Sequence, residues 1–393
     1  MLEESGSRKK AASAACIFTK ITYTETVGPL NGRQAIFFWE VSFMNIWRGY
    51  EHGINFGGWL SQCQYTKEHF DSFITEQDFE TVRSWGLDHI RIPVDYNLFE
   101  NADGSFSEDG LKYIDFAVAQ CRRNGLNMIL DLHKTPGFSF DSFHNELGFF
   151  DNPAYQEHFY DIWTMFAKRF GGNSDMLAFE LLNEVTKKEY NETWKRVART
   201  CIERIRTVAK DITILVGGYY NNSLEAVRDL AEPYDEHIVY NFHCYEPLLF
   251  THQGAPWIIG MDTSFRCPFE MTYREYTEGS KRCLGQSFVP FDRFGSPEEV
   301  PDCRFFETLM ADALAVSEER KVPLYCGEYG VIDRVAPEEA LKWYKAFHAA
   351  LDRHGIGSAA WSYRRMDFGI SDERMNSVRN ELLSVIRGEQ SQK

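Results

Sequence analysis

The chain has 393 residues and a formal net charge of −16, with 44% hydrophobic and 25% charged residues. This composition is that of an ordinary globular protein, and the acidic balance argues against nucleic acid and anionic membranes as partners, because both are bound through clustered Lys and Arg. The apolar runs stay well short of the roughly 20 residues that a membrane-spanning helix needs.

Residues 1–43 do not share the pattern of the rest. We interpret them as an N-terminal extension, a tag or another non-native segment that the protein can lose, with Met44 as a candidate native start. The basic run Arg8-Lys9-Lys10 is followed by too short an apolar stretch for a readable signal peptide. The localisation therefore stays open between an intracellular protein and a secreted one that has lost its signal.

Eight short apolar runs follow, and each predicts a strand. They lie at 53–57, 88–92, 127–132, 177–182, 212–217, 237–242, 323–327 and 357–361. Amphipathic patterns between them predict helices. Thr75 and Asp78 resemble a capping box that opens a helix over 76–85, and the stretch 337–355 has Pro in its first turn and Gly at its end.

Regular alternation of strands and helices predicts a parallel sheet, because parallel neighbours need crossover connections. Eight repeats favour an α/β fold of the (β/α)8 TIM-barrel type over an open sheet. An open sheet would be expected to carry a G-x-G-x-x-G loop after its first strand, and this loop is absent. We expect one barrel domain over 44–393.

The stretch 246–301, after the sixth strand, interrupts this regularity and is rich in aromatic residues. We expect a small inserted subdomain that helps to wall a cleft, with Trp257 as a candidate ligand contact. The alternative is a self-packed subdomain whose aromatic residues form its own core. The nine scattered cysteines contain no C-x-x-C pair, which favours free thiols; one disulfide among Cys267, Cys283 and Cys303 stays open.

The C-terminal ends of barrel strands are where such folds carry their chemistry. The polar or aromatic residues at these ends are Arg91, His133, Asn183, Glu184, His243, Tyr245, Glu328 and Trp361. Each alone has a structural explanation, but buried charges cost too much unless they are paired, so the set favours function. Two carboxylic acids across a barrel mouth suit glycoside hydrolysis, in which one protonates the leaving oxygen and the other attacks the anomeric carbon.

These residues resemble glycoside hydrolase family 5, and most closely its clostridial endoglucanase C type. The resemblance covers about 50–388. Its motifs are Gly53-Ile54-Asn55-Phe56-Gly57-Gly58-Trp59, Arg91-Ile92-Pro93, Leu182-Asn183-Glu184, His243-Cys244-Tyr245, Cys326-Gly327-Glu328-Tyr329-Gly330 and Trp361. One departure is Lys134, which stands where many cellulases of the family have a second histidine.

The resemblance implies that Glu184 is the acid/base and Glu328 the nucleophile. It further implies that Arg91 and Tyr245 orient Glu328 and keep it ionised. The other substrate-binding residues that it implies are Asn183 at the sugar 2-OH, His133 and His243 lining the central subsite, Trp361 as its stacking floor, and Asn55.

We therefore expect a retaining endo-β-glucanase that acts on β-1,4 or mixed β-1,3-1,4 glucan, as a monomer and without metal or cofactor. Mannan, glucomannan and xyloglucan stay open as substrates, and the opening motif also resembles exo-β-1,3-glucanases. A non-catalytic carbohydrate-binding protein would lack one of the two carboxylates. A metal-dependent hydrolase would need clustered ligands such as H-x-H after the first strand, which this sequence does not have.

Overall fold

The computed structural model describes residues 21–26, 36–41, 46–141, 146–287 and 289–389. The chain divides into two compact units, Met1–Phe43 and Met44–Lys393. In the first unit, β1 (Ile21–Thr26) pairs antiparallel with β2 (Ile36–Val41). Sequence analysis did not predict this hairpin, although β1 is rich in the β-branched and aromatic residues that favour strands. Met44, the candidate start, lies outside the described residues.

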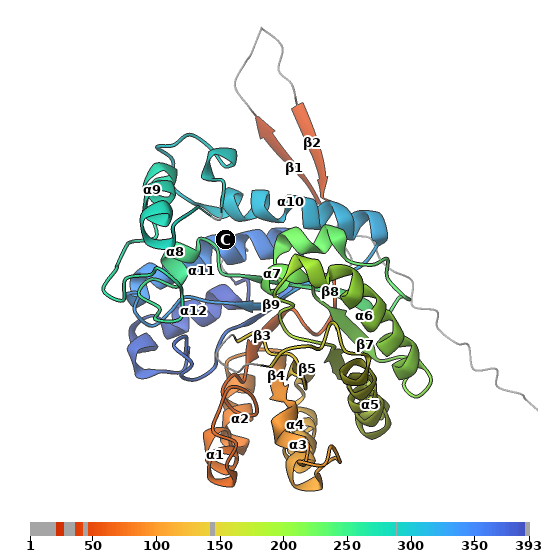
Figure 1. The fold of residues 1–393 in the computed structure, drawn as a ribbon. Coiled ribbons are helices and arrows are strands. Elements are labelled where there is room, and N and C mark those ends of the chain that lie inside the picture. Colours follow the sequence, from red (N-terminus) through yellow and green to blue (C-terminus); the bar gives the residue numbers. More distant parts are fainter. Residues whose placement is uncertain (1–20, 27–35, 42–45, 142–145, 288, 390–393) are drawn as a thin grey trace, which may run out of the picture. The chain divides into compact units, whose positions relative to one another are not determined.

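The second unit contains eight parallel strands closed into a barrel, in the order β10-β3-β4-β5-β6-β7-β8-β9. The strands are β3 (His52–Asn55), β4 (His89–Asp95), β5 (Asn127–Lys134), β6 (Leu177–Glu180), β7 (Thr213–Val216), β8 (Ile238–Cys244), β9 (Leu324–Tyr329) and β10 (Gly357–Ala360). Each predicted strand is present, with shifts only at its ends. The predicted (β/α)8 barrel is confirmed, and Figure 1 shows helices packed around its strands.

Helices connect consecutive strands. The first half of the barrel has α1 (Lys67–Phe73), α2 (Glu76–Ser84), α3 (Tyr96–Phe99), α4 (Glu108–Asn124), α5 (Pro153–Phe170), η2 (Gly171–Asn173), η3 (Lys188–Tyr190) and α6 (Asn191–Arg206). The second half has α7 (Tyr219–Asn222), η4 (Leu224–Asp229), α8 (Leu248–Thr251), α9 (Tyr273–Leu284), η5 (Phe291–Arg293), α10 (Cys303–Arg320), α11 (Pro337–His354), η6 (Glu373–Ser377) and α12 (Arg379–Ile386). No helix among the described residues is both long and apolar enough to span a membrane.

The predicted helix signals operate as expected at two helices. At the start of α2, the Asp78 carboxylate accepts the backbone N–H of Thr75 at 2.7 Å, which completes the capping box. At the end of α11, Gly355 adopts φ 63°, a left-handed conformation that glycine reaches without a side-chain penalty. These local signals fix the helix boundaries that the sequence predicted.

Apolar side chains fill the interior of the barrel below the C-terminal ends of its strands. One cluster inside it consists of Tyr50, Ile129, Ala178, Leu215, Val239, Tyr325 and Ala359. A larger core fills the space between strands and helices and includes the fully buried indoles of Trp163, Trp194 and Trp343. Because this packing leaves the C-terminal strand ends as the open side of the barrel, polar residues at those ends face a common mouth.

The insertion 246–301 contributes α8, α9 and η5. Several of its aromatic residues do pack on one another, as the self-packed alternative expects: the rings of Tyr276 and Phe291 stack with centroids 5.3 Å apart. Trp257 differs from them because 37% of its surface is exposed. The three cysteines for which a disulfide stayed open, Cys267, Cys283 and Cys303, are free thiols.

Candidate active site

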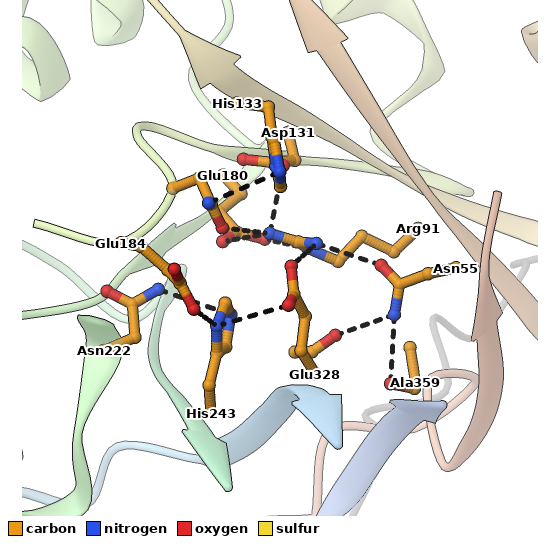
Figure 2. Close-up of polar contacts among 12 residues, drawn as sticks. Asn55, Arg91, Asp131, His133, Glu180, Glu184, Asn222, His243, Glu328 and Ala359 are labelled. Carbon is orange, nitrogen blue, oxygen red and sulfur yellow. Dashed lines mark hydrogen bonds and ion pairs between the residues drawn. The ribbon is translucent and has the colours of Figure 1, made fainter. Parts of the chain in front are cut away.

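The strand-end residues converge at the mouth of the barrel, as Figure 2 shows for most of them. Arg91, His133, His243 and Glu328 lie on β4, β5, β8 and β9, and Glu184 follows β6. These side chains are buried or nearly so. The parallel register of the barrel therefore brings residues that are far apart in the sequence into one polar cluster.

The carboxyl groups of Glu184 and Glu328 face each other across His243 (Figure 2). Nδ1 of His243 lies 2.9 Å from Oε1 of Glu184 and 3.7 Å from Oε2 of Glu328. A carboxylate oxygen of Glu184 lies within 4.8 Å of one from Glu328. The two acids are thus close enough to act on opposite sides of a single bond at one sugar carbon.

Glu328 is held by two donors. Arg91 donates to its Oε1 at 2.7 Å, and the Tyr245 hydroxyl donates to its Oε2 at 3.0 Å. Each donor fixes one oxygen, so the Glu328 side chain is held in one orientation beside the positive charge of a buried guanidinium.

Arg91 is fully buried, so it acts on neighbouring side chains rather than on a sugar. Its Nε and Nη2 donate to Glu180 at 2.6 and 2.9 Å in a bidentate pair, and Nη2 lies 3.0 Å from Asp131. Nη2 also donates to Asn183 at 3.0 Å. A guanidinium engaged on this many sides is rigid, and its removal would leave several buried carboxylates unpaired.

Asn55 requires a correction, because it does not reach the mouth. Its side chain is fully buried and its amide nitrogen donates to the carbonyls of Gly327 and Ala359, each at 3.0 Å, while its oxygen accepts from Arg91 at 2.9 Å. With these partners in place, Asn55 supports Arg91 and the β9 backbone instead of contacting substrate. The sequence motif Gly53–Trp59, which contains Asn55, could not show whether this residue contacts substrate or supports its neighbours.

Sequence analysis missed Glu180 and Asn241 as parts of the cluster. Asn241 donates to Glu180 at 2.8 Å and accepts the N–H of Gly327 at 2.9 Å. It thereby joins the acidic partner of Arg91 to β9, the strand that carries Glu328. An acid in the middle of the apolar run 177–182 was the available signal, since a buried carboxylate needs a partner.

Burial and neighbouring charges shift the pKa values of the ionisable groups in this cluster. Burial raises the pKa of Glu184 above its usual value, while the amide of Asn221 opposes this shift. Burial also raises the pKa of Asp131 to about 7 and lowers that of His243 to about 4. At neutral pH His243 is therefore uncharged, and Glu184, like Asp131, is a carboxyl group whose environment favours retention of a proton.

Glu184 has a left-handed backbone, with φ 42°, which is uncommon for a residue with a side chain. Asn221 donates to its Oε2 at 2.9 Å, and Nδ2 of Asn222 lies 3.4 Å from Nε2 of His243. Strained residues persist where their surroundings over-determine them, often at functional sites. Sequence analysis did not identify this asparagine pair, because nothing local in the sequence links the turn after β7 to Glu184.

Replacing Asn221 with Ala is expected to move the basic limb of the pH profile of kcat/KM to higher pH. The amide stabilises ionised Glu184, so its loss raises the pKa of the acid and keeps the proton on it at higher pH. The measurement is kcat/KM against pH for both proteins on one oligosaccharide. A basic limb that stays where it is would show that this hydrogen bond does not tune the acid.

His133 and Trp361 shape the wall beside the two acids. Their rings are parallel within 2°, with centroids 5.9 Å apart, and His133 is fixed by Asp131 at 2.6 Å. Gly57 lies against the indole so closely that a Cβ there would be 2.7 Å from it. Glycine at this position therefore lets the Trp361 ring lie flat along the barrel mouth.

Lys134, the departure from the family pattern, is buried at the end of β5. Its ammonium lies 3.4 Å from Glu146 and 5.4 Å from the centre of the Tyr96 ring. The Tyr96 hydroxyl donates to the same glutamate at 2.7 Å. The charge of Lys134 is thus compensated within the rim of the barrel.

Trp257 lies in a chain of ring contacts that leads from the insertion to Tyr245, which donates to Glu328. Its ring is 6.2 Å from that of His252, which is 5.0 Å from that of Tyr245, the partner of Glu328. Arg334 lies 5.9 Å from the centre of the exposed indole. This position is compatible with the wall of a cleft, so the expected role of Trp257 stays a prediction.

The variant Trp257→Ala is expected to raise KM for long oligosaccharides several-fold, because a stacking contact contributes about 1 kcal/mol, and to change KM for the shortest substrates little. Steady-state kinetics on a series of increasing chain length measures this. Ile259→Ala is the matched control, since Ile259 lies in the same insertion and is exposed. An unchanged KM for the long members in a folded Trp257→Ala protein would remove Trp257 from the cleft.

Glu184, His243 and Glu328 also form a group that could hold a metal ion, since each offers a ligand atom within 4.8 Å of the others. A cation bound there would occupy both carboxyl groups at once. It would therefore prevent proton transfer and nucleophilic attack by these groups, and would compete with a sugar instead of assisting it.

Comparison with known proteins gives a consistent result. The chain matches the family model described as cellulase (glycosyl hydrolase family 5) over residues 46–367. Cellodextrinase A of Ruminococcus flavefaciens is 43% identical over 341 residues, which cover 86% of this chain and 94% of that protein. Endoglucanase C of Acetivibrio thermocellus is 36% identical over 344 residues, with 86% and 98% coverage.

A solved structure matches the same part of the chain. Endoglucanase Cel5A from the hyperthermophilic Thermotoga maritima superposes with a TM-score of 0.67 at 22% identity, covering 86% of this chain and 97% of that one. At this identity the likeness concerns the fold.

Proposed function

Because the chain belongs to glycosyl hydrolase family 5, as its motifs predict, we propose that it is a retaining endo-β-glucanase in which Glu184 is the acid/base and Glu328 the nucleophile. The chain is an endoglucanase-like glycoside hydrolase by its family. The finer assignment rests on one observation above all, that a carboxylate oxygen of Glu184 lies within 4.8 Å of one from Glu328. Retaining enzymes place these groups about 5–5.5 Å apart, whereas inverting enzymes leave about 6.5–9.5 Å for a water molecule.

In the first step, Glu328 attacks the anomeric carbon while Glu184 gives its proton to the leaving oxygen. The glycosidic bond breaks as an ester bond to Glu328 forms. Arg91 and Tyr245 hold the attacking carboxylate in place, and burial supports the protonated state of Glu184. Neutral His243 lies between the acids without adding a charge that would pair with either.

In the second step, ionised Glu184 takes a proton from water, and the resulting hydroxide attacks the anomeric carbon and releases Glu328. Two displacements restore the original β-configuration. In this proposal Asn183 binds the sugar 2-OH; its oxygen accepts from Arg91 at 3.0 Å, and its amide nitrogen lies 3.5 Å from Nε2 of His133. Hydrogen bonds to the 2-OH strengthen in the transition state of glycoside hydrolysis.

The proposed substrate is β-1,4 or mixed β-1,3-1,4 glucan. The names of the two relatives, a cellodextrinase and an endoglucanase, support this class. We propose Trp361, whose ring lies parallel to that of His133, as the flat apolar surface for a sugar ring whose hydroxyl groups lie around its edge.

Product analysis on a polysaccharide panel tests the proposal. Barley β-glucan and carboxymethyl cellulose should be cleaved, with viscosity falling early as internal bonds break, and laminarin should resist. Preference for glucomannan or xyloglucan would overturn the substrate class. Release of glucose alone from laminarin would indicate an exo-β-1,3-glucanase, and binding without cleavage of any member would indicate a non-catalytic protein.

A further inference from the structure

A hollow lies outside the barrel, between α5 and the loop that leads from α3 into α4. Its volume is about 680 Å³, which is within the range of about 300–1,000 Å³ found for small-molecule sites. Phe106 lines it from the loop, Leu111 from α4, and Met165 from α5. Neither Glu184 nor Glu328 contributes to the lining, so the hollow is separate from the two acids.

The loop wall of the hollow is fixed to α5. Glu100 and Phe106 pair as an isolated antiparallel bridge, which closes the loop into a small hairpin. The Glu100 carboxylate lies 2.6 Å from Nε2 of His158 on α5. The rings of Phe106 and His158 are nearly parallel, with planes at 22° and centroids 6.3 Å apart. The partly buried Phe106 ring is therefore held in one position in the wall.

Polar side chains of α5 accompany this apolar surface. Asp161 and Lys168 line the hollow about two turns apart on the helix, so they lie on the same side of it. Lys168 makes no ion pair with any residue in the described part of the chain. An ammonium donates hydrogen bonds and a carboxylate accepts them. This combination suits a sugar ring, whose faces are apolar and whose hydroxyl groups both donate and accept.

The charges of the lining favour a neutral ligand. Glu108 and Asp161 are acidic, while Lys168 and Arg169 are basic. Arg169 is already paired, at 2.8 Å with Glu108 and at 2.7 Å with Asp115. A phosphate or another polyanion would meet uncompensated carboxylate charge, and a polycation would meet Lys168. A neutral polyhydroxylated chain avoids both penalties.

One continuous segment of the chain connects the hollow to the barrel mouth. β4 ends at Asp95 in the rim, α3 follows at once, and Phe106 comes eleven residues after Asp95. An extended chain of that length spans at most about 40 Å, which sets an upper limit on the separation of the two places. A polysaccharide is longer than this limit, whereas a disaccharide is much shorter.

We propose that the hollow is a second, non-catalytic binding site for a stretch of β-glucan, which holds a polymeric substrate close to the mouth. The identity of this polymer rests on the proposed function. Two binding sites that engage one chain raise its apparent affinity, because the second contact forms within the same complex. A ligand too short to reach both sites gains nothing from the second one.

Polymer binding to a protein that cannot cleave tests the proposal. In Glu328→Ala protein, the retardation during electrophoresis through gels containing barley β-glucan gives Kd for the polymer. Adding Phe106→Ala or Lys168→Ala should raise this Kd about fivefold, the effect of one lost ring or charged contact. The Kd for cellobiose, measured by calorimetry, should stay the same. Lys168 is exposed, so its replacement should leave the fold intact.

Lys210→Ala is the matched control, because Lys210 is an exposed lysine that does not line the hollow; it should retain the polymer affinity. An unchanged polymer Kd in both folded variants, or an equal loss of affinity for polymer and cellobiose, would overturn the second site. Wild-type kinetics separates this outcome from failure of the proposed function. A wild type that cleaves no β-glucan contradicts the function, whereas normal cleavage with unaltered polymer affinity in both variants contradicts the hollow alone.

Discussion

Glu184→Ala is expected to lose about 10²–10⁴-fold of its rate on β-glucan, because proton donation to a sugar leaving group contributes a factor of this size. An aryl β-cellobioside with an acidic phenol needs no proton to leave. Its first step should therefore be largely spared, while the second step slows because no base activates water. Burst kinetics with the aryl substrate, set against steady-state rates on β-glucan, measures both effects.

Azide gives this variant a diagnostic rescue. The anion needs no base, so it should attack the intermediate on Glu328 and yield a β-glycosyl azide, the retained configuration. Glu189→Ala serves as a matched control, because Glu189 is an exposed glutamate a few residues along the chain. Equal loss on both substrate types, without accumulation of an intermediate, would contradict the assignment of Glu184 as acid/base.

Glu328→Ala is expected to show the larger loss, on polysaccharide and aryl substrate alike, because no covalent intermediate can form without the nucleophile. Azide can enter the space left by the carboxylate and displace the leaving group directly. The product should then be an α-glycosyl azide, the inverted configuration, which NMR spectroscopy of the anomeric proton identifies. A β-azide from this variant would mean that the two glutamates have the opposite roles.

Loss of the Glu328 carboxylate also changes the balance of charges around Arg91. The guanidinium would keep Glu180 and Asp131 as partners, so its own burial stays compensated. We therefore expect Glu328→Ala to remain folded, which thermal unfolding can check alongside the kinetics. The lost activity would then reflect the missing nucleophile.

Much of this account could be predicted from the sequence because two local signals are strong. Apolar runs separated by amphipathic stretches define the barrel, and polar residues at the ends of those runs must share its mouth. Glu184, His243 and Glu328 are found in this way, and the structure brings them together. The hydrophobic periodicity and a residue's position in the sequence are enough to predict its place in the site where that place follows from the strand that carries it.

Other features depend on neighbours that the sequence does not reveal. Asn55 was expected to contact substrate, yet it is fully buried and its hydrogen-bond partners come from β4, β9 and β10. Asn221 reaches Glu184 only because the loops after β6 and β7 lie side by side. Contacts between loops, and the direction of a side chain at a strand end, are set by packing in three dimensions and leave no periodic trace.

The measurement that tests the central claim most directly is covalent labelling with a 2-fluoro cellobioside that carries an activated phenol. The fluorine slows both steps, and the good leaving group lets the first proceed, so the intermediate accumulates. Mass spectrometry of the digested enzyme should find one 2-fluorocellobiosyl group, a disaccharide, on the peptide that contains Glu328, and none in Glu328→Ala. A label on another residue would contradict the nucleophile, and an unlabelled enzyme that releases the inverted anomer from β-glucan would contradict the retaining mechanism.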